Sequence, residues 1–165
     1  MHDKDVEFSI NLTEKDLIDE SFLIYLQNHA KEYEIEPSRV TFEILENITV
    51  VKNADAIKEQ LSLLRGMGFK MAVDDFGVEN SNLSRFLDMH FDFIKIDGVF
   101  IKDIVSNEKN IKLTKAIVSL AKSLGMQTIA EYVKDEATYN MVKELGVDLA
   151  QGFYIGKPSE RLMEG

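Results

Sequence analysis

The sequence predicts an α/β fold built on parallel strands. Short segments in which apolar and polar residues alternate recur along the chain, and each is followed by a segment with apolar residues at helical spacing. The chain has 165 residues, of which 45% are hydrophobic, so it can form one domain with a core of its own. Regular alternation of strands and helices is typical of parallel sheets with right-handed crossovers.

The first half of the chain contains three expected strands and three expected helices. Strands are expected at residues 6–11, 39–45 and 70–73, with clear alternation in the first two and an apolar run in the third. Helices are expected at residues 19–33, 53–65 and 81–89, and apolar residues fall on one face of the first two. The third strand ends in the pair Asp74-Asp75.

The second half continues the same pattern. Strands are expected at residues 93–96, 127–130 and 148–151, and helices at 110–124 and 136–145. Gly125 and Gly146 directly follow these two helices and favour their termination there. We find no linker and no low-complexity segment, so the sequence predicts a single domain over residues 1–165.

Composition excludes several classes of protein. The chain has 29 acidic and 19 basic residues, and its net charge of −10 makes a nucleic-acid polymer an unexpected partner. It has no cysteine, which excludes disulfides and cysteine nucleophiles and is compatible with a cytoplasmic location. No stretch approaches the roughly 18 apolar residues of a membrane-spanning helix, so no membrane segment is expected. Glycine-rich nucleotide loops and nucleophile elbows are also missing.

Each expected strand ends in a polar residue. These residues are Asn11, Glu43, Asp74 with Asp75, Lys95 with Asp97, Glu131, and Gln151. Because the carboxyl ends of parallel strands meet at one edge of a sheet, we expect these side chains to face a common cavity. Their oxygen atoms suit Mg²⁺, Mn²⁺ or Ca²⁺. A divalent metal site is therefore one interpretation, and solvated loop residues are the other.

Lys95 and Gln151 leave alternatives open. Lys95 lies between Ile94 and Ile96 and points away from them, either to solvent or inward toward the carboxylates. Gln151 ends an apolar strand and precedes Gly152, and a satisfied buried amide is its simplest interpretation.

Six motifs together resemble the EAL domain family. They are Phe-Ser-Ile-Asn-Leu at 8–12, Phe-Glu-Ile-Leu-Glu at 42–46, Met-Ala-Val-Asp-Asp-Phe-Gly at 71–77, Phe-Ile-Lys-Ile-Asp at 93–97, Ile-Ala-Glu-Tyr-Val at 129–133 and Asp-Leu-Ala-Gln-Gly-Phe at 148–153. Members of this family are TIM-barrel phosphodiesterases of bacterial signalling, which use Mg²⁺ or Mn²⁺ to hydrolyse cyclic di-GMP to linear pGpG. The resemblance implies this fold, reaction and two-ion cofactor site, with cyclic di-GMP as the small-molecule partner.

The resemblance also implies a role for each polar residue. The metal ligands would be Asn11, Glu43, Asp74, Asp75 and Glu131, with Asp74 shared between two ions and Asp75 on the second. The catalytic residues would be Lys95, Glu131, Gln151 and Asp75, of which Lys95 and Gln151 hold the attacking water and the phosphate. Glu46 would anchor the loop after Asp75, and Asp97 would act with it on the substrate or the loop.

The chain also departs from the family pattern. It has no Glu-Ala-Leu segment and matches the family from its third strand onward, so we expect an incomplete TIM-type (β/α) barrel with about six of eight strands. Val78 and the four residues after it depart from the family loop, Tyr132 replaces a common glycine, Lys134 a common glutamate, and Gly156 a common serine.

These departures predict impaired hydrolysis by this chain. The alternative is a degenerate, non-catalytic EAL domain that acts as a cyclic di-GMP receptor or a regulatory interaction module. A third interpretation is another metal-dependent α/β hydrolase that uses the same acidic residues. An open barrel can be completed by a second chain, so self-association or a homodimer is expected.

Overall fold

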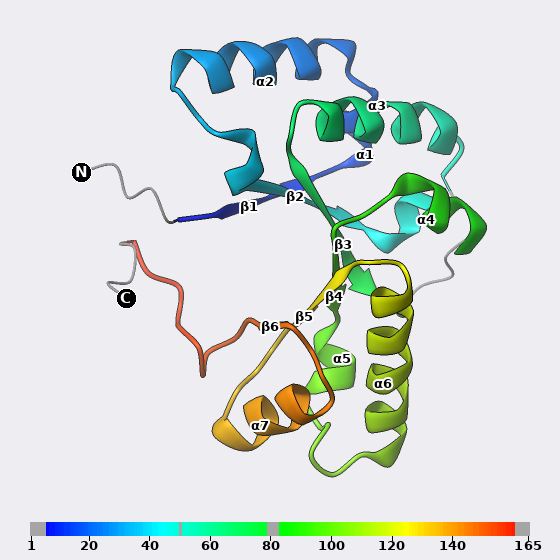
Figure 1. Cartoon of the computed structure of the whole chain (residues 1–165), viewed down its shortest axis with the longest axis vertical. Helices are drawn as coiled ribbons and strands as arrows, with labels where there is room; N and C mark the ends of the chain where they lie inside the picture. The colour runs from blue at the N-terminus through cyan, green and yellow to red at the C-terminus, as the bar shows by residue number, and fades with distance from the viewer. Residues whose placement is uncertain (1–5, 50, 79–82, 161–165) are drawn as a thin grey trace. The chain divides into compact units, whose positions relative to one another are not determined.

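The computed structural model describes residues 6–49, 51–78 and 83–160. The chain divides into two compact units, Met1–Phe93 and Ile94–Gly165, and each is described by itself. Figure 1 labels their helices and strands. No helix within the described ranges is long and apolar enough to cross a membrane.

The first unit is built on three parallel strands. These are β1 (Phe8–Leu12), β2 (Val40–Leu45) and β3 (Lys70–Phe76), hydrogen-bonded in that order. Between them lie α1 (Glu14–Ile18), α2 (Glu20–Glu32), two 3₁₀ turns (Pro37–Arg39 and Glu46–Thr49) and α3 (Ala54–Gly66), and β3 is followed by α4 (Leu83–Met89). Helices α1, α2 and α3 lie on one side of these strands (Figure 1).

The apolar core of this unit lies between its strands and helices. Phe42 of β2 contacts Phe22 of α2, with ring centroids 6.4 Å apart, and Phe69 at 5.0 Å. Ile57 and Leu61 of α3 are fully buried. Because side chains alternate along a strand, packing of Phe42 toward the helices directs its neighbour Glu43 to the opposite face of the sheet.

The second unit has the same alternation. Strand β4 (Phe93–Ile96) leads into α5 (Gly98–Ile101) and α6 (Glu108–Ser123), β5 (Gln127–Ala130) into α7 (Glu136–Glu144), and β6 (Leu149–Ala150) follows. Strand β5 pairs in parallel with β6, with Ile129 opposite Leu149. The N–H of Glu131 donates to the carbonyl of Ile96 at 3.2 Å, which joins the end of β5 to β4.

The alternation of strands and helices predicted from sequence is confirmed, but two short helices were not expected. Helix α1 begins with a reciprocal capping box between Thr13 and Asp16, and α5 begins with Asp97 as its N-cap. They have 5 and 4 residues, too few to show a helical period in the sequence.

The expected boundaries are otherwise close to those observed, with three differences. Strand β3 continues three residues beyond the predicted 70–73, and β6 is shorter than the predicted 148–151. Helix α6 begins two residues before the predicted 110, because the side chain of Asn107 caps it. The first two residues of the predicted helix at 81–89 lie outside the described residues.

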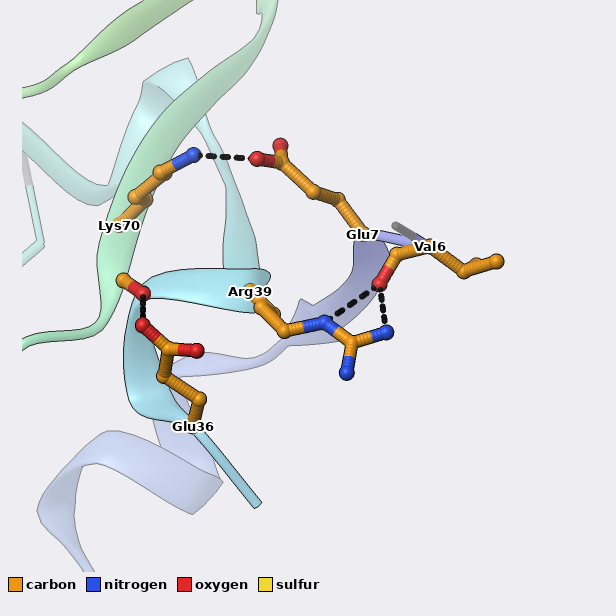
Figure 2. A network of polar contacts seen from close by, with 6 residues as sticks. Val6, Glu7, Glu36, Arg39 and Lys70 are labelled. Carbon is orange, nitrogen blue, oxygen red and sulfur yellow. Dashed lines mark hydrogen bonds and ion pairs between the residues drawn. The ribbon is translucent and has the colours of Figure 1, made fainter. Parts of the chain in front are cut away.

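Polar contacts hold the chain before β1 against the starts of β2 and β3 (Figure 2). Arg39, just before β2, donates from Nε to the carbonyl of Val6 at 2.9 Å. Lys70, the first residue of β3, pairs with Glu7 at 2.8 Å. Ser38 donates to Glu36 at 2.8 Å in the turn that leads into β2. The amino ends of the three strands are therefore joined by side chains as well as by the sheet.

Two aspartates make the same contact directly before a strand begins. Asp92, the residue before β4, accepts from the backbone N–H of Met71 in β3 at 2.8 Å. Asp148, the residue before β6, accepts from the backbone N–H of Thr128 in β5, also at 2.8 Å. The hydroxyl of Thr128 donates to the same carboxylate at 2.8 Å. Each aspartate thus fixes the start of its strand against a defined residue of the strand before it.

We expect Asp148→Ala to lower the free energy of unfolding by about 1–3 kcal/mol, because it leaves the fully buried Thr128 N–H without its carboxylate acceptor. Urea unfolding followed by circular dichroism measures the loss. The matched control is Asp103→Ala at an exposed aspartate, which should change stability by less than about 0.5 kcal/mol. Equal effects of the two substitutions would contradict the role given to Asp148.

Asp135 predicts a dependence of stability on pH. Its carboxylate accepts from the N–H of Thr138 at 2.8 Å at the start of α7, and this bond holds its pKa below the ordinary value of 3.8. A pKa that is lower in the folded state contributes stability above that ordinary value, and the contribution is lost as pH falls below it.

We therefore expect the native chain to lose more stability than Asp135→Asn when the pH is lowered from about 6 to about 3, since asparagine caps a helix without titrating. Urea midpoints of both proteins at the two pH values give the comparison. If the two proteins lose the same amount, Asp135 does not contribute in this way.

Candidate functional site

Three predicted ligands of the first unit share one face of its sheet. Asn11 of β1 lies directly opposite Glu43 of β2. Leu45, two residues after Glu43 and on the same face, lies opposite Asp74 of β3. Asn11 is exposed, and Glu43 and Asp74 are half-buried. All three lie toward the carboxyl ends of their strands, so the first unit presents an amide and two carboxylates together, as the sequence predicts for a shared edge.

The backbone of β3 is left-handed at Asp75, one residue before the strand ends. Asp75 has a φ of +55°, in the left-handed region, and its N–H donates to Asp74 Oδ1 at 3.1 Å. Aspartate tolerates this conformation better than most residues because its short side chain forms local hydrogen bonds. This conformation interrupts the alternation of β3, and a carboxylate oxygen of Asp75 lies within 4.8 Å of one of Asp74.

Glu46 holds the segment after Asp75. Its side chain is 2% exposed, and Oε2 accepts from the N–H of Gly77 at 3.0 Å. Gly77 has a φ of +95°, a conformation that requires glycine. A buried carboxylate thus fixes a glycine two residues beyond Asp75, which limits how far this turn can move.

Lys95 and Glu131 form an ion pair in the second unit. Lys95 Nζ lies 2.9 Å from Glu131 Oε1, and the two side chains are 4% and 13% exposed. The interpretation that Lys95 reaches solvent is therefore wrong, and the inward one holds. A lysine inside a strand between two fully buried isoleucines needs a carboxylate partner, because an unpaired buried charge is strongly destabilising.

Gln151 is held by its backbone and exposes its side chain. Its N–H donates to Ala130 at 2.8 Å, and its carbonyl accepts from the N–H of Val133 at 3.0 Å. A Cβ on the next residue, Gly152, would overlap backbone atoms of Val133, so only glycine allows this close approach. The simple interpretation of Gln151 as a buried amide is wrong, because the residue is exposed.

Asp97 has a clear structural contact. Its Oδ1 accepts from the N–H of Val99 at 2.6 Å and caps α5. The sequence resemblance places Asp97 with the substrate or the loop, and its role as a helix cap is not visible in the sequence pattern because α5 has only 4 residues. The sequence pattern also gives no signal for Gly98, because the residue that it contacts, Tyr132, is distant in the sequence.

Parallel strands with polar residues at their carboxyl ends are typical of α/β proteins of the barrel type. In α/β proteins of the barrel type, functional groups lie at the carboxyl ends of the strands, whereas residues at the amino ends serve stability. The sequence model of the EAL domain matches residues 1–158 of this chain, and the chain belongs to the EAL domain family.

Named relatives and solved structures agree with this assignment. The chain is 35% identical over 155 residues to the probable cyclic di-GMP phosphodiesterase PdeA of Escherichia coli K12, with 94% of this chain and 21% of the relative covered. It resembles the EAL domain of Mycobacterium smegmatis DcpA with a TM-score of 0.86 and 30% identity, covering 92% of this chain and 68% of that one. For the PaMucR phosphodiesterase in complex with c-di-GMP the TM-score is 0.85 at 28% identity, covering 92% and 61%.

These comparisons confirm the predicted fold class. The chain is an α/β protein of the TIM-barrel type, with six strands among its described residues. It spans about a fifth of the length of PdeA.

We expect Lys95→Met to lower the free energy of unfolding by about 3 kcal/mol, because it leaves the nearly buried Glu131 without its cation. The matched control is Lys112→Met, which breaks the exposed pair between Lys112 and Glu108 within α6 and should cost less than about 0.5 kcal/mol. Chemical unfolding of both variants makes the comparison. Similar losses of unfolding free energy in the two variants would mean that the pair of Lys95 with Glu131 stabilises the fold no more than an exposed ion pair does.

Proposed function

We propose that this chain takes part in metal-dependent hydrolysis of cyclic di-GMP to pGpG. The observation that carries the proposal is the ion pair of Lys95 with Glu131, because a paired lysine inside a strand has few structural uses and the resemblance to the EAL domain family implies that both residues act at the site. Membership of the EAL domain family and the names of the relatives support the same reaction.

The ligand chemistry fits a hard divalent cation. Carboxylate and amide oxygens are the ligands that Mg²⁺ and Mn²⁺ prefer, and the chain has neither cysteine nor clustered histidines that would favour zinc. The proposed ligands are Asn11, Glu43, Asp74, Asp75 and Glu131. When bound, a two-ion centre would polarise the phosphodiester and lower the pKa of a water molecule.

The chain's own residues then have separate tasks. The Lys95 ammonium is held at Glu131 and would donate to a phosphate oxygen or a water bound beside that carboxylate. Gln151 can donate its amide to the same substrate, since its side chain is exposed and its backbone is fixed on both sides. Glu46 limits movement of the segment after Asp75 through its bond to Gly77.

Self-association and a cytoplasmic location stay predictions. Strands β1 and β6 are the first and last strands in the sheet order, and both carry exposed apolar side chains. Phe8 and Ile10 of β1 are 50% and 48% exposed, and Leu149 of β6 is 47% exposed. Exposed apolar side chains on edge strands support contact with a partner.

Incubation of the chain with cyclic di-GMP and Mn²⁺, followed by chromatography, tests the proposal. We expect slow formation of pGpG, and we expect Glu43→Gln to lower the rate by about 10–100-fold because it removes a charged metal ligand. Glu59→Gln on the exposed side of α3 is the matched control and should leave the rate unchanged.

Product that forms equally fast with Glu43→Gln would contradict the proposed ligands. Saturable nucleotide binding without product would contradict hydrolysis by this chain and favour the receptor interpretation instead.

A further inference from the structure

Tyr132 adopts a backbone conformation that disfavours its own side chain. Its φ is +54°, in the left-handed region where glycine is at ease and a bulky residue is strained. The position follows Glu131 directly and is the one at which the family commonly has glycine. Since the tyrosine keeps the conformation of a glycine, contacts of its side chain must offset the backbone cost.

Those contacts come from the first residue of α5 and from Lys102, its C-cap. The ring of Tyr132 packs against the backbone of Gly98 so closely that a Cβ at position 98 would overlap three of its ring atoms, Cδ2, Cγ and Cε2. Lys102, one turn further along, places its Nζ over the same ring at 4.3 Å from the centroid. The ring of Tyr132 is therefore bound by two residues: Gly98 leaves space for it by having no side chain, and Lys102 places a cation against its face.

A second contact joins the same segment to the end of α5. Lys134 Nζ donates to the carbonyl of Lys102 at 2.6 Å. Between these two contacts the N–H of Val133 donates to the carbonyl of Gln151 at 3.0 Å. The segment that follows β5 is thus attached at successive residues, and Glu131 lies at its beginning, where its own N–H donates to Ile96.

We propose that Gly98, Lys102 and Tyr132 form an aromatic latch, and that Tyr132 is a positioning residue that holds Glu131 against Lys95. The latch ties the residue next to Glu131 to α5, which begins three residues after Lys95 and is separated from the end of β4 by Asp97. The carboxylate is therefore placed by a fixed backbone rather than by the attraction of the lysine alone. The consequence for turnover rests on the proposed function, whereas the latch itself does not.

A double-mutant cycle in the absence of substrate and metal separates positioning from simple packing. Lys95→Met is made in the native chain and in Tyr132→Gly, a change that suits the left-handed backbone but removes the ring. With the latch present, Glu131 stays at its position after the lysine is lost, and its charge is costly there. Without the latch, Glu131 can move toward water.

We expect the fall in urea midpoint caused by Lys95→Met to be reduced to about half or less in the Tyr132→Gly background. Tyr132→Phe is the matched control, because it keeps the ring over Gly98 and under Lys102, and should show the full fall. Equal falls in all three backgrounds would overturn the positioning role and leave Tyr132 as a packing residue.

Gly98→Ala provides a test that does not depend on Lys95→Met folding. In the native chain the added methyl group displaces the ring, so the urea midpoint should fall. In the Tyr132→Gly background the same change should raise the midpoint, because alanine favours the helix and the ring is gone. The same sign in both backgrounds would overturn the latch.

Turnover gives the last comparison. If the native chain hydrolyses cyclic di-GMP, Tyr132→Gly should lower kcat with little change in KM, although glycine is common in the family at this position, because in this chain the ring of Tyr132 places Glu131. Tyr132→Phe should keep the native kcat. A native chain without turnover would count against the proposed function alone, since the unfolding experiments still decide the latch. Unchanged kcat in Tyr132→Gly, with turnover present, would overturn the positioning role.

Discussion

The register of parallel strands is the constraint on which the candidate site depends. A slip of one residue would turn every side chain of a strand to the other face, and parallel strands have no tight turn to prevent it. In this chain the carboxylates of Asp92 and Asp148 each bind a backbone N–H of the preceding strand. In the first unit, ladder pairing between β1, β2 and β3 keeps Asn11, Glu43 and Asp74 on one face.

Burial of charge is the second constraint. Lys95 lies in a strand whose other residues are all buried, and its pairing with Glu131 makes the lysine tolerable there. The pair also requires β4 and the end of β5 to stay adjacent, which the bond between Glu131 and Ile96 secures. A polar group placed inside the sheet therefore specifies where its partner strand must end.

The sequence predicted the parts of the structure that follow from periodicity. All six strands were expected, and β4 and β5 have the predicted boundaries, because alternation and apolar runs are local properties. Helices α1 and α5 were not predicted, because a single helical turn shows no period in the sequence. Their caps, Thr13 and Asp97, are residue types that commonly begin helices. Burial of Lys95 and exposure of Gln151 depend on neighbours that are distant in the sequence. Alternation alone therefore could not decide whether Lys95 points to solvent or inward, and it wrongly favoured a buried side chain for Gln151.

The amino and carboxyl ends of the strands have different roles. Arg39, Lys70, Asp92 and Asp148 make their contacts at the amino ends, whereas the candidate site residues occupy the carboxyl ends. Changes at Asn11, Glu43 or Asp74, which are exposed or half-buried, therefore leave the contacts at the amino ends intact. A lineage can lose its chemistry by drift and keep a folded scaffold, which is how a nucleotide-binding protein without catalysis can descend from an enzyme of this architecture.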